Sequence, residues 1–267
     1  LHSGYMLQKL GGLQLAKPYL MEAITPKYVF SKTMKKLGIS HIIGFTNLTT
    51  QAVRKSGFLN TSTIYPGKDL FHKIAADYSI INKYNLNNKK WFLFSGAPAP
   101  TRGAEILIQA VDKVKNNNIR LVMLMRTDVG SSYENIKKAL VAMKHPERIH
   151  IINEKVTREQ LKAFFNCAYY ALLPFIVIPS EIPLTYFELL SCSTPIITFK
   201  NGGTTDYLQE GLIIANKSIK GLAITLDKTW DNEKLRAQLS TKALQKMENH
   251  PYWKEVAIQW INLLKKQ

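Results

Sequence analysis

The chain has 267 residues, and 46% of them are hydrophobic, so it can bury a substantial core as one large domain or two smaller ones. Its longest apolar run, residues 169–179, is interrupted by Pro174 and is well short of the roughly 20 residues that a membrane-spanning helix needs. The N-terminal residues lack the basic start, the apolar stretch and the cleavage site of a signal peptide, so we expect no leader.

The chain is strongly basic, with 36 Lys and Arg residues against 19 Asp and Glu residues and a formal net charge of +17. Such an excess attracts nucleic acid, anionic lipid or phosphorylated small molecules. The lysines are scattered as pairs, such as Lys35 and Lys36, over segments typical of solvated helix faces. Much of the charge therefore has an ordinary explanation as a soluble surface.

Cysteine and histidine usage argues against a disulfide framework and against a metal site. Cys167 and Cys192 are the only cysteines, and they lie apart in apolar segments. None of the six histidines has another histidine four residues away, which is the spacing of a metal-binding pair on a helix. We therefore expect no metal, no cofactor and a reducing compartment, the cytoplasm.

The N-terminal part reads as a fragment of an α/β domain. Two short strands are predicted at 41–45 and 61–65, with helices at 29–37 and 49–56. Because two strands cannot form an independent α/β sheet, we interpret residues 1–66 as the C-terminal part of a first domain. Residues 67–90 then form the interdomain connection.

From Trp91 onward, short apolar runs alternate with amphipathic helices, which is typical of a parallel sheet covered on both faces. One of these helices should open with a capping box between Thr157 and Gln160. We predict a doubly wound α/β domain over residues 91–250, followed by a C-terminal helix within 251–267 that packs back towards the N-terminal part. The candidate strands are 91–95, 120–125, 149–152, 169–175, 195–199 and 212–215.

In open parallel sheets, ligands bind outside the carboxyl ends of the strands, so the loops after each strand are the places to examine. The first such loop, "SGAPAPTRGAEIL" at 95–107, places Arg102 and Gly103 at the start of a helix. Free amides and the helix dipole attract phosphate there, and the guanidinium could add a bidentate grip. The loop matches neither the dinucleotide fingerprint nor a Walker loop, so a solvated arginine is the competing interpretation.

A second loop, "PSEIPLTYFELLSCSTPII" at 179–197, offers two glutamates and a helix start. Glu181 and Glu188 are seven residues apart, about two helical turns, so both could face one cleft. The amides of Leu184 and Thr185 would then point at an anion. The competing interpretation is a capping box, in which Glu188 in the first helical turn folds back on the amide of Thr185. A third loop, "KNGGTTDYLQEG", lets the chain turn at a glycine pair after a strand.

In this order, the pieces resemble the retaining glycosyltransferases of the two-domain GT-B fold, specifically family 4. The usual family signatures are G-R-x-x-x-x-K-G, then P-S-x-x-E-G-F-G-x-x-x-x-E-A-x-A-x-G-x-P-V-I, then a glycine pair. Here "GAPAPTRG" stands in the place of the first, and the segments "PSEIPLTYFELLSCSTPII" and "KNGG" resemble the rest. The likeness spans residues 28–267. It implies a C-terminal Rossmann-like donor domain and a partial N-terminal Rossmann-like domain.

The resemblance implies a nucleotide-sugar donor site. Glu188 would bind the ribose hydroxyls, and Arg102 would replace the family lysine that neutralises the diphosphate. The remaining implied donor contacts are Gly96, Gly103, Ser180, Glu181, Leu184 and Thr185.

The chain departs from the family pattern at two places. Ala97 stands where a second basic residue is usual, so we expect the missing diphosphate contact from Arg126. The first family glutamate falls on Ser180, one residue before Glu181, which we expect to reach the sugar instead.

The implied activity is sugar transfer with retention of configuration, in which the protein positions the substrates and neutralises the leaving diphosphate. Arg102 and Glu181 are the residues expected to act in catalysis. The acceptor would be a glycan, a lipid-linked molecule or a small molecule. Because the first domain is incomplete in this sequence, we expect weak transfer from this chain alone.

Two other functions stay open on the sequence. A nucleotide-sugar 2-epimerase shares the fold but would need a pair of acids and histidines in the cleft loops, which we do not find. A nucleic-acid-binding module would use the charge, but no aromatic platform or recognition helix supports it, so we expect no specific nucleic acid. The basic surface could instead hold the enzyme against anionic lipid at the cytoplasmic face of a membrane.

Overall fold

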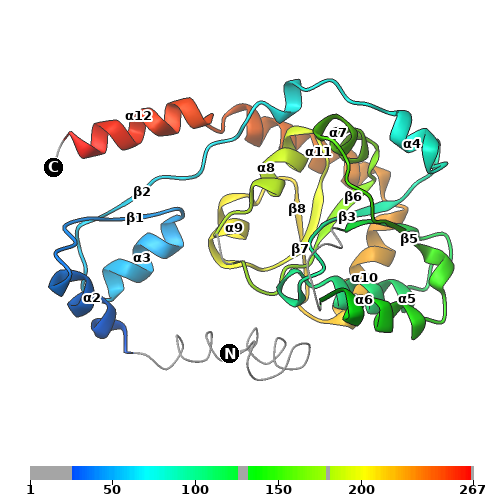
Figure 1. Cartoon of the computed structure of the whole chain (residues 1–267), viewed down its shortest axis with the longest axis horizontal. Coiled ribbons are helices and arrows are strands. Elements are labelled where there is room, and N and C mark those ends of the chain that lie inside the picture. Colours follow the sequence, from blue (N-terminus) through cyan, green and yellow to red (C-terminus); the bar gives the residue numbers. More distant parts are fainter. Residues whose placement is uncertain (1–25, 126–131, 179–180, 266–267) are drawn as a thin grey trace.

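The computed structural model describes residues 26–125, 132–178 and 181–265 (Figure 1). Its N-terminal part pairs two short parallel strands, β1 (Ile42–Gly44) and β2 (Thr61–Thr63). Helix α2 (Lys27–Lys36) precedes β1, and α3 (Asn47–Lys55) connects the two strands. The Thr46 hydroxyl caps α3 by accepting a hydrogen bond from the amide of Thr49.

The larger sheet has six parallel strands in the order β5-β4-β3-β6-β7-β8. The chain order reverses between β3 and β6, so this pair is the topological switch point at which ligands bind in such sheets. This is the doubly wound α/β sheet predicted from the sequence. The strands are β3 (Phe92–Gly96), β4 (Leu121–Met125), β5 (Ile149–Ile152), β6 (Tyr170–Leu173), β7 (Ile196–Phe199) and β8 (Leu212–Ala215).

Helices cover both faces of this sheet, as Figure 1 shows. One face carries α5 (Ala104–Asp112), α6 (Ser132–Val141) and α10 (Ile219–Trp230). The other face carries α4 (Ser79–Lys83), α7 (Arg158–Cys167), α8 (Leu184–Ser191) and α11 (Glu233–Glu248). Side chains of each strand alternate between the two cores: Phe92 and Phe94 join the first, and Leu93 joins the second.

The sequence placed most elements within one or two residues of their observed bounds. The capping box of α7 is present, because the Thr157 hydroxyl accepts from the amide of Gln160 and the Gln160 side chain accepts from the amide of Thr157. The strand predicted at 169–175 is shorter, since β6 ends at Leu173 and Pro174 follows it directly. A proline has no amide hydrogen, so it cannot donate to the strand ladder.

The glycine pair after β7 is not the loop that the sequence predicted. Gly202 and Gly203 are the first residues of a short helix, α9 (Gly202–Tyr207). A Cβ atom at position 203 would lie only 2.3 Å from the Oγ1 of Thr46, which caps α3. The glycine is therefore needed because α9 packs closely against the N-terminal part of the molecule.

The chain passes between the two parts of the molecule at two segments, one near Lys68 and one near Pro251. These two segments are hydrogen-bonded to each other. The amide of Lys68 donates to the Pro251 carbonyl at 2.9 Å, and the Lys68 ammonium donates to the Met247 carbonyl at the end of α11. Nε2 of the buried His250 lies 2.8 Å from the Pro66 carbonyl, and its Nδ1 lies 2.7 Å from the Tyr207 hydroxyl. A carbonyl only accepts, so Nε2 carries the proton and Nδ1 accepts from the tyrosine.

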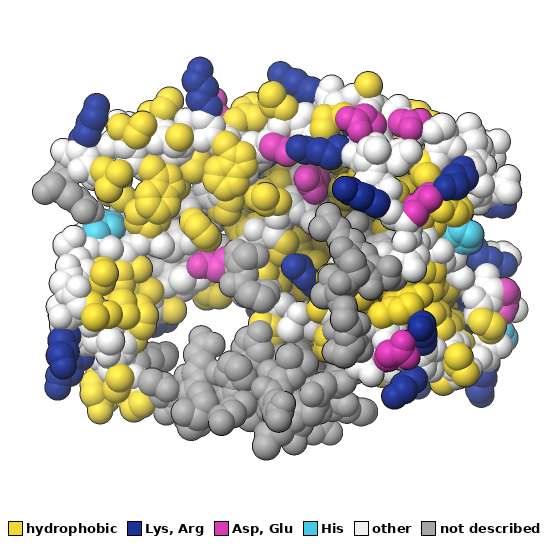
Figure 2. Space-filling model, viewed as in Figure 1, with side chains coloured by type: hydrophobic (Ala, Val, Ile, Leu, Met, Phe, Trp, Pro, Cys, Tyr) yellow, Lys and Arg dark blue, Asp and Glu magenta, His cyan; other side chains and the backbone are white. Residues whose placement is uncertain are grey.

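The C-terminal helix α12 (Trp253–Leu264) runs back above the N-terminal part in Figure 1. Val256 is its only buried residue, Trp260 and Leu263 are half-buried, and Ile258, Ile261 and Leu264 are about half exposed or more. Figure 2 shows hydrophobic side chains along this helix open to solvent. Within the described residues, no helix combines the length and the hydrophobicity that crossing a bilayer requires.

The described residues also include three short 3-10 helices. They are η1 (Phe71–Lys73), η2 (Pro100–Arg102) and η3 (Pro146–Arg148).

Candidate functional site

The loops that follow β3 and β6 meet at the switch point of the sheet. The loop after β3 contains η2, which ends at Arg102, and Gly103 then serves as the N-cap of α5. The amide of Ile176, just after β6, donates to the Thr101 carbonyl at 2.8 Å. This bond holds the two loops together at the carboxyl edge of the sheet.

Gly103 fits its position for two reasons. Its φ is +73°, in the left-handed region that favours glycine, and a Cβ there would lie 2.2 Å from the Pro174 carbonyl oxygen. Gly96 ends β3, and a Cβ there would meet only the Phe94 ring at 3.7 Å. The backbone therefore requires glycine at position 103 but not at position 96.

Arg102 presents a half-buried cation at this edge. Its guanidinium carbon lies 4.5 Å from the centre of the Phe175 ring, within the range of a cation–π contact. Burial lowers the pKa of Arg102, and no carboxylate or other acceptor among the described residues binds its side chain. An arginine stays charged under these conditions, so the site holds a positive charge that is available to an anion.

Helix α8 begins at Leu184, and Pro183 is its N-cap. The capping-box interpretation is therefore wrong. Thr185 is the second helical residue, no side chain caps the helix, and Glu188 is in the second turn, not the first. The amides of Leu184 and Thr185 have no acceptor among the described residues, whereas the amide of Tyr186 donates to the Pro183 carbonyl at 3.0 Å. Two free amides at a helix N-terminus suit an anion.

Glu188 is a half-buried carboxylate that makes no hydrogen bond and no ion pair within the described residues. Burial raises its pKa, the charge of Asp69 raises it further, and the charge of Arg158 opposes them. Asp69 and Arg158 are themselves an ion pair, with 2.5 Å between Oδ2 and Nη2. Among the described residues, no hydrogen bond or ion pair of Glu188 offsets the desolvation of its carboxylate.

Glu181 adopts a left-handed backbone conformation with φ +57°, which is uncommon for a residue other than glycine. Its carbonyl accepts a hydrogen bond from the Thr204 hydroxyl of α9. Its Oε2 atom is buried and has no hydrogen-bond partner among the described residues. Two other predicted contacts, Ser180 and Arg126, lie outside the described residues.

Sequence reasoning missed two polar side chains at this edge. The Asn201 amide, after β7, donates to the carbonyls of Phe175 at 3.0 Å and Phe199 at 3.1 Å. The Lys217 ammonium, after β8, donates to the Ile176 carbonyl at 2.6 Å. Each lies two residues after the end of its strand, and that position is the signal that the sequence offers for both.

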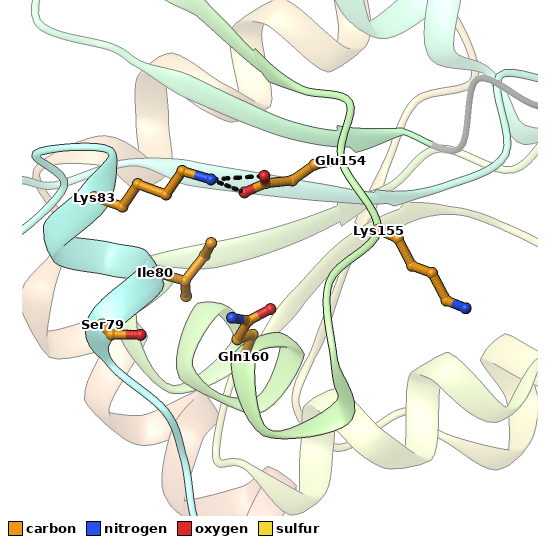
Figure 3. Close-up of a pocket in the computed structure, with 6 residues that line it drawn as sticks. All are labelled: Ser79, Ile80, Lys83, Glu154, Lys155 and Gln160. Atoms are coloured by element: carbon orange, nitrogen blue, oxygen red, sulfur yellow. Dashed lines mark hydrogen bonds and ion pairs between the residues drawn. The ribbon is translucent and has the colours of Figure 1, made fainter.

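A separate pocket of about 350 Å³ lies at the end of the outer strand β5 (Figure 3). Two of its lining residues, Lys83 of α4 and Glu154, form an ion pair of 2.6 Å. It is away from the β3–β6 switch point, and its Lys83 and Glu154 side chains already bind each other. No group of three or more His, Cys, Asp or Glu side chains in the described parts of the chain is arranged to hold a metal ion.

Solved structures confirm the fold. Sucrose-phosphate synthase from Thermosynechococcus elongatus superposes with a TM-score of 0.72 over 85% of this chain and 58% of its own, at 16% identity. Anabaena Alr3699/HepE, solved in complex with UDP and glucose, gives a TM-score of 0.75 over 92% of this chain and 69% of its own, at 13% identity. A glycosyltransferase from Rickettsia africae gives 0.75 over 88% and 66%, at 14% identity.

Sequence comparison points the same way. The uncharacterized glycosyltransferase MJ1178 of Methanocaldococcus jannaschii is 25% identical over 181 residues, which cover 64% of this chain and 48% of that protein. The chain therefore spans about half the length of this curated relative. The profile of the family "Glycosyl transferases group 1" matches residues 78–246, which include Arg102 and Glu188. The chain belongs to the group 1 glycosyltransferase family.

Proposed function

We propose that this chain binds a nucleotide-sugar donor at the β3–β6 switch point and serves the transfer of its sugar to an acceptor with retention of configuration. The observation that carries the proposal is the pairing of an available cation with an available carboxylate. Arg102 has no acidic partner among the described residues, and Glu188 has no donor among them. Both are half-buried at one edge of the sheet, and neither has a hydrogen-bond or ion-pair partner among the described residues that would offset its desolvation.

The diphosphate and the ribose of a nucleotide-sugar donor each have groups at this site that could bind them. The diphosphate would lie between the Arg102 guanidinium and the free amides of Leu184 and Thr185. The ribose hydroxyls would donate to the Glu188 carboxylate, which lies one helical turn further along α8. Gly96 and Gly103 would let the backbone approach the phosphates.

In the reaction, charge builds up on the leaving diphosphate as the bond to the sugar breaks. Arg102 and the α8 amides would stabilise that charge, and such preorganised donors are usually the largest contribution to catalysis. The departing diphosphate would take the proton of an acceptor that attacks from the same face, which gives retention. Glu181, with its buried and unpartnered oxygen, would orient the sugar. This scheme assigns no role to a metal ion or to a protein nucleophile.

Uridine donors are the first to test, because Anabaena Alr3699/HepE has been solved in complex with UDP-glucose. We propose a glycan or a lipid-linked acceptor, with peripheral contact between the basic surface and anionic lipid at the cytoplasmic face of a membrane. Loss of liposome binding on charge reversal of Lys35 and Lys36 would support that contact. Unchanged binding to anionic liposomes would refute it.

Calorimetric titration with UDP, GDP, ADP and their glucose conjugates tests the donor site. At least one should bind saturably, and Arg102→Ala should weaken it about 10- to 150-fold, the equivalent of a charged hydrogen bond of roughly 1.5 to 3 kcal/mol. Arg102→Lys should keep part of the affinity as a point charge. The corresponding nucleoside, which lacks the phosphates, should bind the wild type and Arg102→Ala equally. Absence of saturable binding by every nucleotide in the set would refute the proposal.

A further inference from the structure

Lys217 lies in the loop after β8, one residue before Ser218, the N-cap of α10. Its side chain is half-buried and reaches past the end of β7, which separates β8 from β6 in the sheet. The ammonium donates to the Ile176 carbonyl at 2.6 Å, a short charge-assisted hydrogen bond. This bond links the loop after β8, at the edge of the sheet, to the loop after β6, at the switch point.

The segment that receives this bond, residues 174–178, is where two other loops attach. The amides of Ile176 and Val177 donate to the Thr101 carbonyl after β3, at 2.8 and 3.4 Å. The Asn201 side chain after β7 donates to the Phe175 carbonyl at 3.0 Å. Loops after β3, β7 and β8 therefore all bind the one segment that follows β6.

Arg102 depends on the same segment. Its guanidinium lies over the Phe175 ring, and Phe175 precedes the residue whose carbonyl Lys217 binds. Thr101, which accepts from the two amides of the segment, precedes Arg102 in the chain. A shift of the segment would move both the aromatic surface beneath the guanidinium and the backbone that carries it.

Making this bond with a lysine costs desolvation free energy. Burial lowers the pKa of Lys217 to about 8, so the folded protein gives up free energy to keep the ammonium charged. Its neighbour Lys220, three residues on at the start of α10, is exposed. A half-buried cation at this position is therefore unlike the solvated lysines that give the chain most of its charge.

We propose that Lys217 is a positioning residue for the binding of the donor diphosphate. Through the Ile176 carbonyl it fixes the segment 174–178, and through that segment it fixes the Phe175 ring and the guanidinium of Arg102. The inference rests on the proposed function, because it assigns to Arg102 the role of diphosphate ligand. It adds a residue outside the predicted donor contacts that acts on affinity without touching the nucleotide.

The test uses the full chain with Lys217→Met, which keeps the length of the side chain but removes its donors. UDP, GDP and ADP are titrated in parallel with uridine, guanosine and adenosine, so that phosphate-dependent binding is separated from base binding. Lys217→Met should weaken the tightest nucleoside diphosphate about three- to tenfold and leave its nucleoside unchanged. Lys217→Arg should restore most of the affinity, and Lys220→Met, the matched control, should behave as wild type.

A double-mutant cycle separates positioning from direct contact. In an Arg102→Ala background, Lys217→Met should cause no further loss, because the group that it positions is already gone. An equal loss in both backgrounds would overturn the positioning role, as would wild-type affinity in Lys217→Met.

Amide hydrogen exchange measured without ligand tests whether Lys217 holds the segment 174–178 in place. In Lys217→Met, the amides of Ile176 and Val177 should exchange faster, while those of β4 should not change. Unchanged exchange at the segment would overturn the inference even if nucleotide binding fails in every protein, an outcome that would separately refute the proposed function. Should Lys217→Met fold poorly, Lys217→Gln serves the same comparisons.

Discussion

Replacing Glu188 with glutamine separates a ligand-binding carboxylate from a structural one. The substitution keeps the size of the side chain and removes the charge. In the folded protein the carboxylate has no hydrogen bond or ion pair within the described residues, and burial raises its pKa. Glu188→Gln should therefore leave the stability unchanged or increase it at neutral pH. Binding of the donor nucleotide should fall about 10- to 150-fold, because hydrogen bonds to a charged group contribute roughly 1.5 to 3 kcal/mol.

The pH dependence of the free energy of unfolding independently checks whether the ionised Glu188 carboxylate stabilises or destabilises the fold. A raised folded-state pKa means that the native protein holds a proton on Glu188 more tightly than the unfolded chain does. The ionised carboxylate therefore destabilises the fold at pH values above its folded pKa. That penalty disappears as the pH falls through the folded pKa to the unfolded value of about 4.3.

Urea denaturation from pH 8 to pH 4 and calorimetry at pH 7.5 measure the two effects. Any stability advantage of Glu188→Gln should be largest at pH 8 and vanish near pH 4. Glu147→Gln is the matched control, since Glu147 is exposed and lies before β5, at the opposite edge of the sheet. A loss of about 0.5 to 2 kcal/mol at neutral pH with unchanged nucleotide binding would refute the reasoning, because that is the signature of a helix cap.

Three further outcomes follow from the same geometry. Thr185→Ala should not reduce the stability in urea, because Thr185 caps nothing and alanine is the better helix former; a loss near 1 kcal/mol would restore the capping box. Gly103→Ala should cost roughly 2 to 4 kcal/mol in the same assay, through its left-handed backbone and its clash with Pro174, whereas Gly96→Ala should cost under about 1 kcal/mol; equal costs would contradict this. The pKa of His250 is lowered to about 4 by burial, so its neutral form stabilises the fold above the unfolded pKa of about 6.5, and that stability is lost as the pH falls towards 4. The loss should approach roughly 3 kcal/mol and be absent in His250→Gln, and equal pH profiles would exclude this role.

The sequence predicts the sheet well because each buried parallel strand is a short apolar run. The residues of β5 and β8 were placed with their observed bounds, and β4 differs from its prediction by one residue. The capping box of α7 was also predictable, since Thr157 and Gln160 need only each other and the local backbone. What depends on distant contacts was not predictable. Gly203 reads as a loop glycine until α9 is seen against Thr46, which is 157 residues earlier in the chain (203 − 46 = 157).

In the candidate site, too, residues marked by the local sequence could be predicted, and a residue that depends on a distant contact could not. Arg102 and Glu188 could be predicted as site residues because each occupies a loop or helix that follows a strand, which is a property of the local sequence. Lys217 was missed because its importance lies in a bond to Ile176, 41 residues away. Its position after β8 is a weak signal in a chain with 36 Lys and Arg residues, and its half-burial sets it apart from the exposed lysines.

Pro183 explains why a sequence that matches a capping box does not form one. A cap must have non-helical backbone angles, so Thr185 could cap only a helix that begins at the residue after it. Pro183 has φ −65°, which is suited to leading into a helix, and the chain enters the helical conformation at Leu184 instead. Thr185 is then inside the first turn, and its side chain cannot reach the amide that a cap would satisfy. As a result, the amides of Leu184 and Thr185 have no acceptor and Glu188 has no donor within the described part of the chain, which leaves these groups available to a ligand.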